Sequence, residues 1–180
     1  MKSETKVKSE TYSDSNVKSI TKTAIMAALV FLATYVIKIP SPNGYTHLGD
    51  CLIFVAVLIL GSRRGALAGG LGAALADLMG GYAQWVLPSF FIKGIMALIM
   101  GVVTYKLFPK LRFGWLIGAL VGGVVQIALY TLVKIPMYGL PYALTRLPGL
   151  VLQTIFGVII AVVIIAVLNE SSLIKKLREV

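Results

Sequence analysis

The stretch GSRRGALAGGLGAALADLMGGYAQW, residues 61–85, decides how this chain folds. Two adjacent arginines, Arg63 and Arg64, stand near its start and are followed by a run of Gly, Ala and Leu. It ends with an acid, Asp77, and a connection that contains no Lys or Arg. Because charged side chains at the centre of a bilayer are costly, the arginine pair marks a membrane surface. The stretch predicts a helix that starts at a basic surface and ends near the opposite one.

The composition places the chain in a membrane. Hydrophobic residues make up 58% of the 180 residues and charged residues only 13%, whereas soluble domains carry about 25% charged residues. The net charge of +10 would suggest nucleic-acid binding in a soluble protein. In so apolar a chain the basic residues are better interpreted as topology signals. With the single Cys51 and one His, we expect no disulfide, metal site or cofactor, and no nucleic-acid partner.

Six apolar segments follow a polar N-terminal stretch. They are 23–39, 48–61, 65–78, 88–108, 113–133 and 148–168. A full span needs about 20 residues; the last three segments meet this length, and the second and third are shorter. These two could form one re-entrant hairpin, but its tip would bury Arg63 and Arg64 in the membrane. We therefore expect six spans.

The distribution of basic residues sets the orientation. With six spans and a cytoplasmic N-terminus, thirteen Lys and Arg residues lie on the inner side and three on the outer side, which agrees with the positive-inside rule. We predict an all-α integral membrane protein with six transmembrane helices and cytoplasmic termini. Its parts are a flexible cytoplasmic tail (1–22), a six-helix membrane domain (23–169) and a basic cytoplasmic tail (170–180), with no cleaved signal peptide.

Two rows of small residues predict close helix packing. Each row recurs every fourth residue and then becomes polar: Gly61, Gly65, Gly69, Ala73 and Asp77 in one, and Gly114, Gly118, Gly122, Gln126, Tyr130 and Lys134 in the other. The pattern favours tight packing at the inner end and a polar opening at the outer end. Ordinary packing with polar ends at the interface is the alternative.

Polar and aromatic residues gather at the predicted outer end. Asp77, Lys93, Lys134 and Arg146 lie there with several tyrosines and Trp85, a combination typical of a small-molecule site. Other interpretations remain open: Lys93 could reach the interface or form a structural pair with Asp77, and Lys134 and Arg146 could be interface anchors. The Pro- and Gly-containing connections at 38–50 and 134–146 predict irregular turns that cover the site.

Residues 45–101 resemble the S component, the membrane substrate-binding subunit, of energy-coupling factor (ECF) vitamin transporters. The residues that carry the resemblance are Leu48-Gly49-Asp50, the small-residue helix ending ALAD, GYAQW, and FFIKG. The resemblance implies six helices, a vitamin site near the outer face, and location in the cell membrane, in a bacterium. It also implies partners, namely a transmembrane coupling protein and two ATPases, and docking through Ala24 and Ala28 on the first helix.

The same resemblance implies a set of binding residues and a group of substrates. By its pattern, the substrate is bound by Asn43, Tyr45, Trp85, Lys93, Gln126, Tyr130 and Gln153. Asp77 is expected to be structural and to position Lys93. The substrate is expected to be hydroxymethylpyrimidine or a pyridoxine-type compound, with riboflavin, pantothenate and other vitamins as alternatives.

The alternatives are a membrane enzyme and a self-sufficient secondary transporter or channel. A membrane enzyme is disfavoured because the chain has no H-E-x-x-H, G-x-S-x-G or Walker A sequence. The missing Walker A sequence also means that any dependence on ATP must come from partners. A self-sufficient secondary transporter or channel stays open, although the two halves show no convincing inverted repeat.

Overall fold

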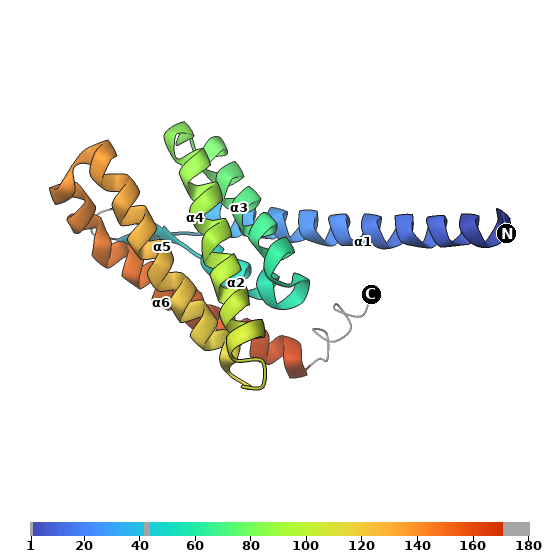
Figure 1. Ribbon diagram of the computed structural model, residues 1–180. Coiled ribbons are helices and arrows are strands. Elements are labelled where there is room, and N and C mark those ends of the chain that lie inside the picture. The colour runs from blue at the N-terminus through green and yellow to red at the C-terminus, as the bar shows by residue number, and fades with distance from the viewer. Residues whose placement is uncertain (1, 42–43, 171–180) are drawn as a thin grey trace.

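The computed structural model describes residues 2–41 and 44–170, and the side chains of residues 16–37 and 46–168. Within these residues the chain forms a bundle of six α-helices with one π-helical segment and one β-hairpin (Figure 1). The elements are α1 (Lys2–Tyr35), β1 (Lys38–Ser41), β2 (Gly44–His47), α2 (Gly49–Leu60), α3 (Ser62–Met79), α4 (Ala83–Val102), η1 (Val103–Leu107), α5 (Gly114–Tyr138) and α6 (Leu140–Glu170).

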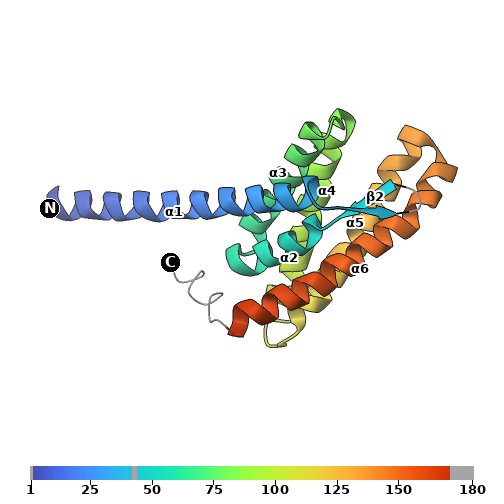
Figure 2. The ribbon, with the colours of Figure 1, turned by 180° about the vertical axis from the view of Figure 1, so that it is seen from behind.

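Helix α1 is much longer than the first apolar segment. It has 34 residues, and its N-terminal part extends away from the bundle (Figures 1 and 2). Residues 2–22 were expected to be a flexible tail, but the structure continues the helix through them. No Gly or Pro interrupts residues 2–35, and the many Lys and Glu residues are good helix formers. The division into a tail and a membrane domain stays a prediction, and residues 171–180 lie outside the described part.

Helix α2 is the centre of the bundle. It has 12 residues, which gives a length of about 18 Å, and it contacts α1, α3, α4 and α6. Most of its side chains are buried, including Ile53, Phe54 and Val57, each fully. A helix enclosed in this way can be almost wholly apolar and still be shorter than a membrane span.

The two small-residue rows pack against neighbouring backbones, as predicted. A Cβ atom added at Gly65 on α3 would lie 2.7 Å from the Cα atom of Val57 on α2. One added at Gly118 on α5 would lie 2.6 Å from the carbonyl oxygen of Met100 on α4. Glycine at these positions therefore allows the helix axes to approach more closely than any side chain would permit.

The first connection contains regular structure where irregular turns were expected. Strands β1 and β2 pair antiparallel, with Ile39 opposite Thr46. Strand β2 contacts α6, and the Thr46 hydroxyl donates to the carbonyl oxygen of Gly149, 3.4 Å away. β-Branched and aromatic residues in the second strand favour pairing, and a proline is tolerated in the first because a two-stranded sheet has only edge strands.

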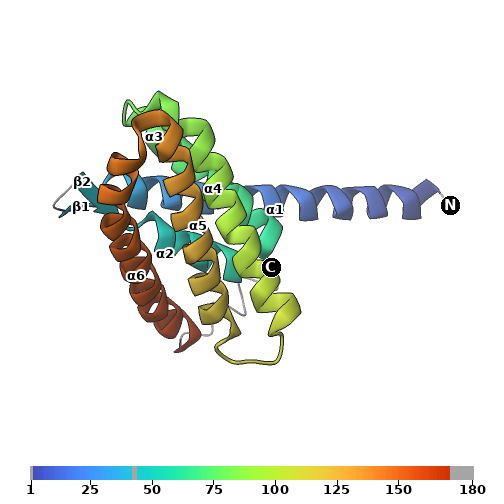
Figure 3. The ribbon, with the colours of Figure 1, turned by 60° about the vertical axis from the view of Figure 1, so that its left-hand side comes forward.

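The second connection is almost absent. Residues 134–146 were expected to form turns, but α5 runs to Tyr138 and α6 begins at Leu140, with one residue between them. That residue, Gly139, has φ +87°, a conformation that glycine adopts without strain. Pro141 lies in the first turn of α6, where no backbone N–H is needed. Helices α4, α5 and α6 thus follow one another as neighbours (Figure 3).

Four helices among the described residues are long and apolar enough to cross a membrane. They are Asn16–Tyr35, Ala83–Leu107, Gly114–Tyr138 and Leu140–Leu168. Helix α2 is too short, and α3 is rich in glycine, with Arg63 and Arg64 in its first turn. A helical membrane protein fits these findings; the six crossings and the cytoplasmic position of both termini stay predictions.

Candidate functional site

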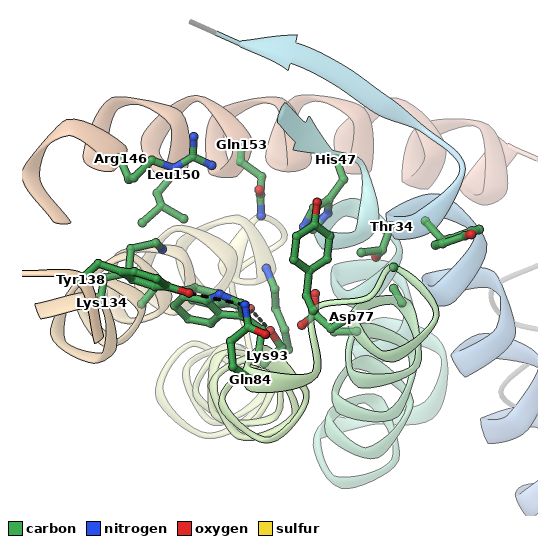
Figure 4. Close-up of a pocket in the computed structure, with 18 of the residues that line it drawn as sticks. Thr34, His47, Asp77, Gln84, Lys93, Lys134, Tyr138, Arg146, Leu150 and Gln153 are labelled. Atoms are coloured by element: carbon green, nitrogen blue, oxygen red, sulfur yellow. Dashed lines mark hydrogen bonds between the residues drawn. The ribbon is translucent and has the colours of Figure 1, made fainter. Parts of the chain in front are cut away.

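A cavity of about 500 Å³ lies where α3 and α5 end and α4 and α6 begin. We call it the main cavity; its size is within the range of about 300–1,000 Å³ that is usual for small-molecule sites. Its polar and aromatic lining residues come from five helices, β2 and the α3–α4 connection (Figure 4): Thr34, Tyr35, His47, Asp77, Tyr82, Gln84, Trp85, Ser89, Lys93, Tyr130, Lys134, Tyr138, Tyr142, Arg146 and Gln153.

A buried ion pair forms the floor of the main cavity. Lys93 on α4 donates to Oδ1 of Asp50 on α2, and the two side chains are 1% and 0% exposed. Lys93 also donates to Oε1 of Gln126 on α5, at 2.6 Å. Since a buried charge is stable only when it is paired and hydrogen-bonded, these contacts explain how a lysine and an aspartate lie together in the core.

The second oxygen of Asp50 is occupied as well. Its Oδ2 accepts from Nε2 of Gln126 at 2.7 Å and from Nε2 of Gln153 on α6 at 3.0 Å. Gln126 also contacts the hydroxyl of Thr154, at 3.0 Å. The network joins α2, α4, α5 and α6 and uses both carboxylate oxygens, so Asp50 is a structural anchor beneath the cavity.

Aromatic rings form one wall. Trp85 lies 5.8 Å from Tyr130 and 6.2 Å from Tyr138 between ring centroids, and Tyr138 lies 4.9 Å from Tyr142. The Tyr130 hydroxyl and the Ser89 hydroxyl are hydrogen-bonded at 2.9 Å. Such a wall offers flat faces on which a heterocyclic ring can stack.

Lys134 is held against this wall. Its Nζ atom lies 5.0 Å from the ring centroid of Trp85 and 4.9 Å from that of Tyr130, which is a favourable cation–π arrangement. Its exposed fraction is 8%. The interface-anchor interpretation of Lys134 is therefore wrong, because the side chain points into the protein and lines the main cavity.

Asp77 lines the cavity without joining the floor network. Among residues with described side chains, Lys93 forms its ion pair with Asp50, so the alternative of an Asp77–Lys93 pair is wrong. Asp77 lies close to Ser89, which also lines the cavity. Its Oδ2 atom is buried and has no hydrogen-bond partner in the described part of the chain.

The structure brings most of the predicted binding residues together. Trp85, Lys93, Tyr130 and Gln153 line the main cavity, and Gln126 lies beneath it in the floor network. Asn43 lies outside the described residues, as does the side chain of Tyr45. Whether any of these residues contacts a substrate stays a prediction.

Sequence reasoning did not select Asp50 for the site. Its signal is the Leu48-Gly49-Asp50 stretch, in which glycine precedes the acid. A Cβ atom added at Gly49 would lie 2.1 Å from Oγ1 of Thr34. The glycine therefore lets α2 begin directly against α1 and places Asp50 in the core.

The chain is similar to a known protein family and to proteins from two organisms. The model of the family described as ECF-type riboflavin transporter, S component, matches residues 14–170. The thiamine precursor transporter HmpT of Lactococcus lactis subsp. cremoris is 29% identical over 167 residues, which cover 91% of this chain and 95% of that protein. An uncharacterized protein in gap 3′ region of Pyrococcus woesei is 33% identical over 133 residues, covering 73% of this chain and 88% of that protein.

Proposed function

We infer the function of this chain from one premise: it belongs to the family of ECF-type riboflavin transporter S components. The names of the family and of one relative indicate a transporter component rather than an enzyme. We propose that the chain is the high-affinity substrate-binding subunit of an ATP-driven vitamin uptake transporter. Its proposed substrate is a small heterocyclic vitamin or precursor, hydroxymethylpyrimidine or pyridoxine in preference to riboflavin or pantothenate.

The main cavity is the observation that carries this proposal. It combines an aromatic wall at Trp85 with a few polar groups held in fixed positions by the floor network, as expected of a site for one small ring compound. We propose that Trp85, Lys93, Tyr130 and Gln153 contact the substrate. Gln126 supports them from below.

A second hollow supports the proposed orientation. It lies where α2 joins α3 and α4 meets η1, and it is lined by Arg63, Arg64 and Lys106. This basic end is opposite the main cavity along α3, since the cavity is lined by the C-terminal part of that helix. By the positive-inside rule the basic end faces the cytoplasm and the main cavity opens outward. We propose a bacterial plasma membrane as the location.

Helix α1 offers a surface for the proposed partners. Ala27 and Val30 pack on α3, where a Cβ atom at Gly72 would meet both residues. Ala24 and Ala28 lie on another face of α1 and are exposed. Exposed small residues at this spacing let a second membrane helix approach closely. We propose that the coupling protein docks here, carrying two ATPases that supply the ATP hydrolysis.

Two measurements on the purified chain test the proposal. Mass spectrometry of small molecules that co-purify with it should identify a vitamin or precursor. Isothermal titration calorimetry should then give a nanomolar dissociation constant for that compound at one site per chain. The absence of binding to hydroxymethylpyrimidine, pyridoxine, riboflavin and pantothenate would overturn the proposal. Ion-coupled transport by the chain alone in liposomes would favour a secondary transporter.

A further inference from the structure

Asp77 is the acid of the main cavity that has one buried oxygen without a hydrogen-bond partner. Its Oδ2 is the one buried side-chain nitrogen or oxygen without a hydrogen-bond partner among the described side chains. Asp50, by contrast, has both oxygens occupied. An ionised carboxylate only accepts hydrogen bonds, and leaving it unpaired and buried costs free energy. The position therefore calls for a ligand group that donates.

The opposite side of the cavity carries the complementary charge. Lys134 and Arg146 both line the cavity, and no carboxylate with a described side chain lies within ion-pair distance of either. Figure 4 shows Asp77 on one side of the cavity and Lys134 and Arg146 on the other. A ligand that fills the space thus meets an acceptor at one end and donors at the other.

We propose that Asp77 is the specificity-determining residue of the site and recognises an amino group next to a ring nitrogen, as in a 4-aminopyrimidine. This inference rests on the proposed function and narrows its substrate class. On binding, the ring nitrogen takes up one proton from water, so that it and the amino group donate to the two carboxylate oxygens in parallel, the arrangement that makes paired charge-assisted hydrogen bonds strong. The second ring nitrogen, on the opposite edge of the ring, then accepts from the Lys134 side of the cavity.

The same geometry disfavours the competing vitamins. The imide edge of riboflavin places its N–H between two carbonyl oxygens, which a carboxylate repels. Pantothenate carries its own carboxylate, and pyridoxine presents one ring N–H without an adjacent amino group. Because Asp77 is a buried acceptor, a ligand that offers it fewer donors should bind much more weakly than a 4-aminopyrimidine.

The test uses a pair of ligands that differ at one position. Isothermal titration calorimetry on the full chain in detergent compares 4-amino-5-hydroxymethyl-2-methylpyrimidine with its 4-oxo analogue. The wild-type chain should bind the amino compound roughly ten- to hundredfold more tightly, because the oxo compound places an acceptor against Asp77. In Asp77→Asn the side chain both donates and accepts, which matches the oxo edge and the unprotonated amino edge alike, so the preference should vanish. Lys134→Met should weaken both ligands alike and keep their ratio.

The outcomes separate this inference from the proposed function. Equal affinity of the wild-type chain for the two pyrimidines would overturn the inference and leave the transport role standing. The same holds if the chain binds pyridoxine or riboflavin but neither pyrimidine. Failure to bind any of the vitamins tested would overturn both. If Asp77→Asn does not fold, the ratio of the two pyrimidine affinities measured for the wild-type chain decides whether the inference holds.

Discussion

Lys93 and Asp50 form an ion pair between α4 and α2, although 43 positions separate them in the chain. The pair lies directly under the main cavity, and Gln126 and Gln153 complete its hydrogen bonds. The pair and its hydrogen bonds fix where α2, α4, α5 and α6 meet. They therefore also fix the position of the cavity floor.

Breaking this pair should destabilise the fold. Lys93→Met leaves Asp50 charged and without its cation in the core, which costs about 3–5 kcal/mol in comparable buried pairs. Thermal unfolding in detergent should show a clear fall in the melting temperature. Combining it with Asp50→Leu should make the double variant less destabilised than the sum of the two single variants. Additive losses would show that the two side chains do not depend on each other.

Gly118 should tolerate no larger residue. Gly118→Leu would force a side chain against the carbonyl oxygen of Met100, 2.6 Å from the position of its Cβ. Overpacking of this kind costs about 1–3 kcal/mol or more, so the monodisperse fraction in size-exclusion chromatography should fall. Val124→Leu on the same helix is a matched control because Val124 is 66% exposed. Equal behaviour of the two variants would contradict the close packing.

Enlarging the exposed alanines of α1 should separate uptake from binding. Ala24→Leu with Ala28→Leu should abolish vitamin uptake in cells that express the chain with its partners, while affinity measured on the purified chain stays unchanged. Ala128→Leu on α5 adds the same bulk at another exposed alanine and should leave uptake intact. Normal uptake by the double variant would exclude this face as the docking surface.

The orientation can be tested by cysteine labelling in intact cells. Cys51, the single native cysteine, is 2% exposed and should not react. A membrane-impermeant maleimide should label Ala83→Cys from outside and should reach Arg64→Cys only after the cells are opened. Both positions are exposed and lie near opposite ends of α3, Arg64 in its first turn and Ala83 at the start of α4. The reverse pattern of labelling would refute the proposed topology.

The sequence predicted features that depend on local periodicity. The small-residue rows predicted close packing because small residues at every fourth position of a helix let a neighbouring helix approach closely. The gathering of Trp85, Tyr130 and Lys93 followed from placing each residue by depth along its own helix. These predictions needed only helix geometry and an orientation.

The sequence could not predict which charged side chains form ion pairs with each other. Whether Lys93 pairs with Asp50 or Asp77 depends on the rotation and approach of three helices, which no local pattern encodes. The connections were misjudged for a related reason. Pro136 and Pro141 were read as turn formers, but one lies within α5 and the other in the first turn of α6.

The aromatic wall gives the protein its own optical probe. The chain has two tryptophans; Trp85 belongs to the wall, whereas Trp115 packs against the hydrophobic core near the other end of α5. Replacing Trp115 with Phe would leave a single indole beside Lys134, whose ammonium group lies over its ring. Any molecule that enters the cavity must change the emission of that indole, so occupancy could be followed in real time without a label.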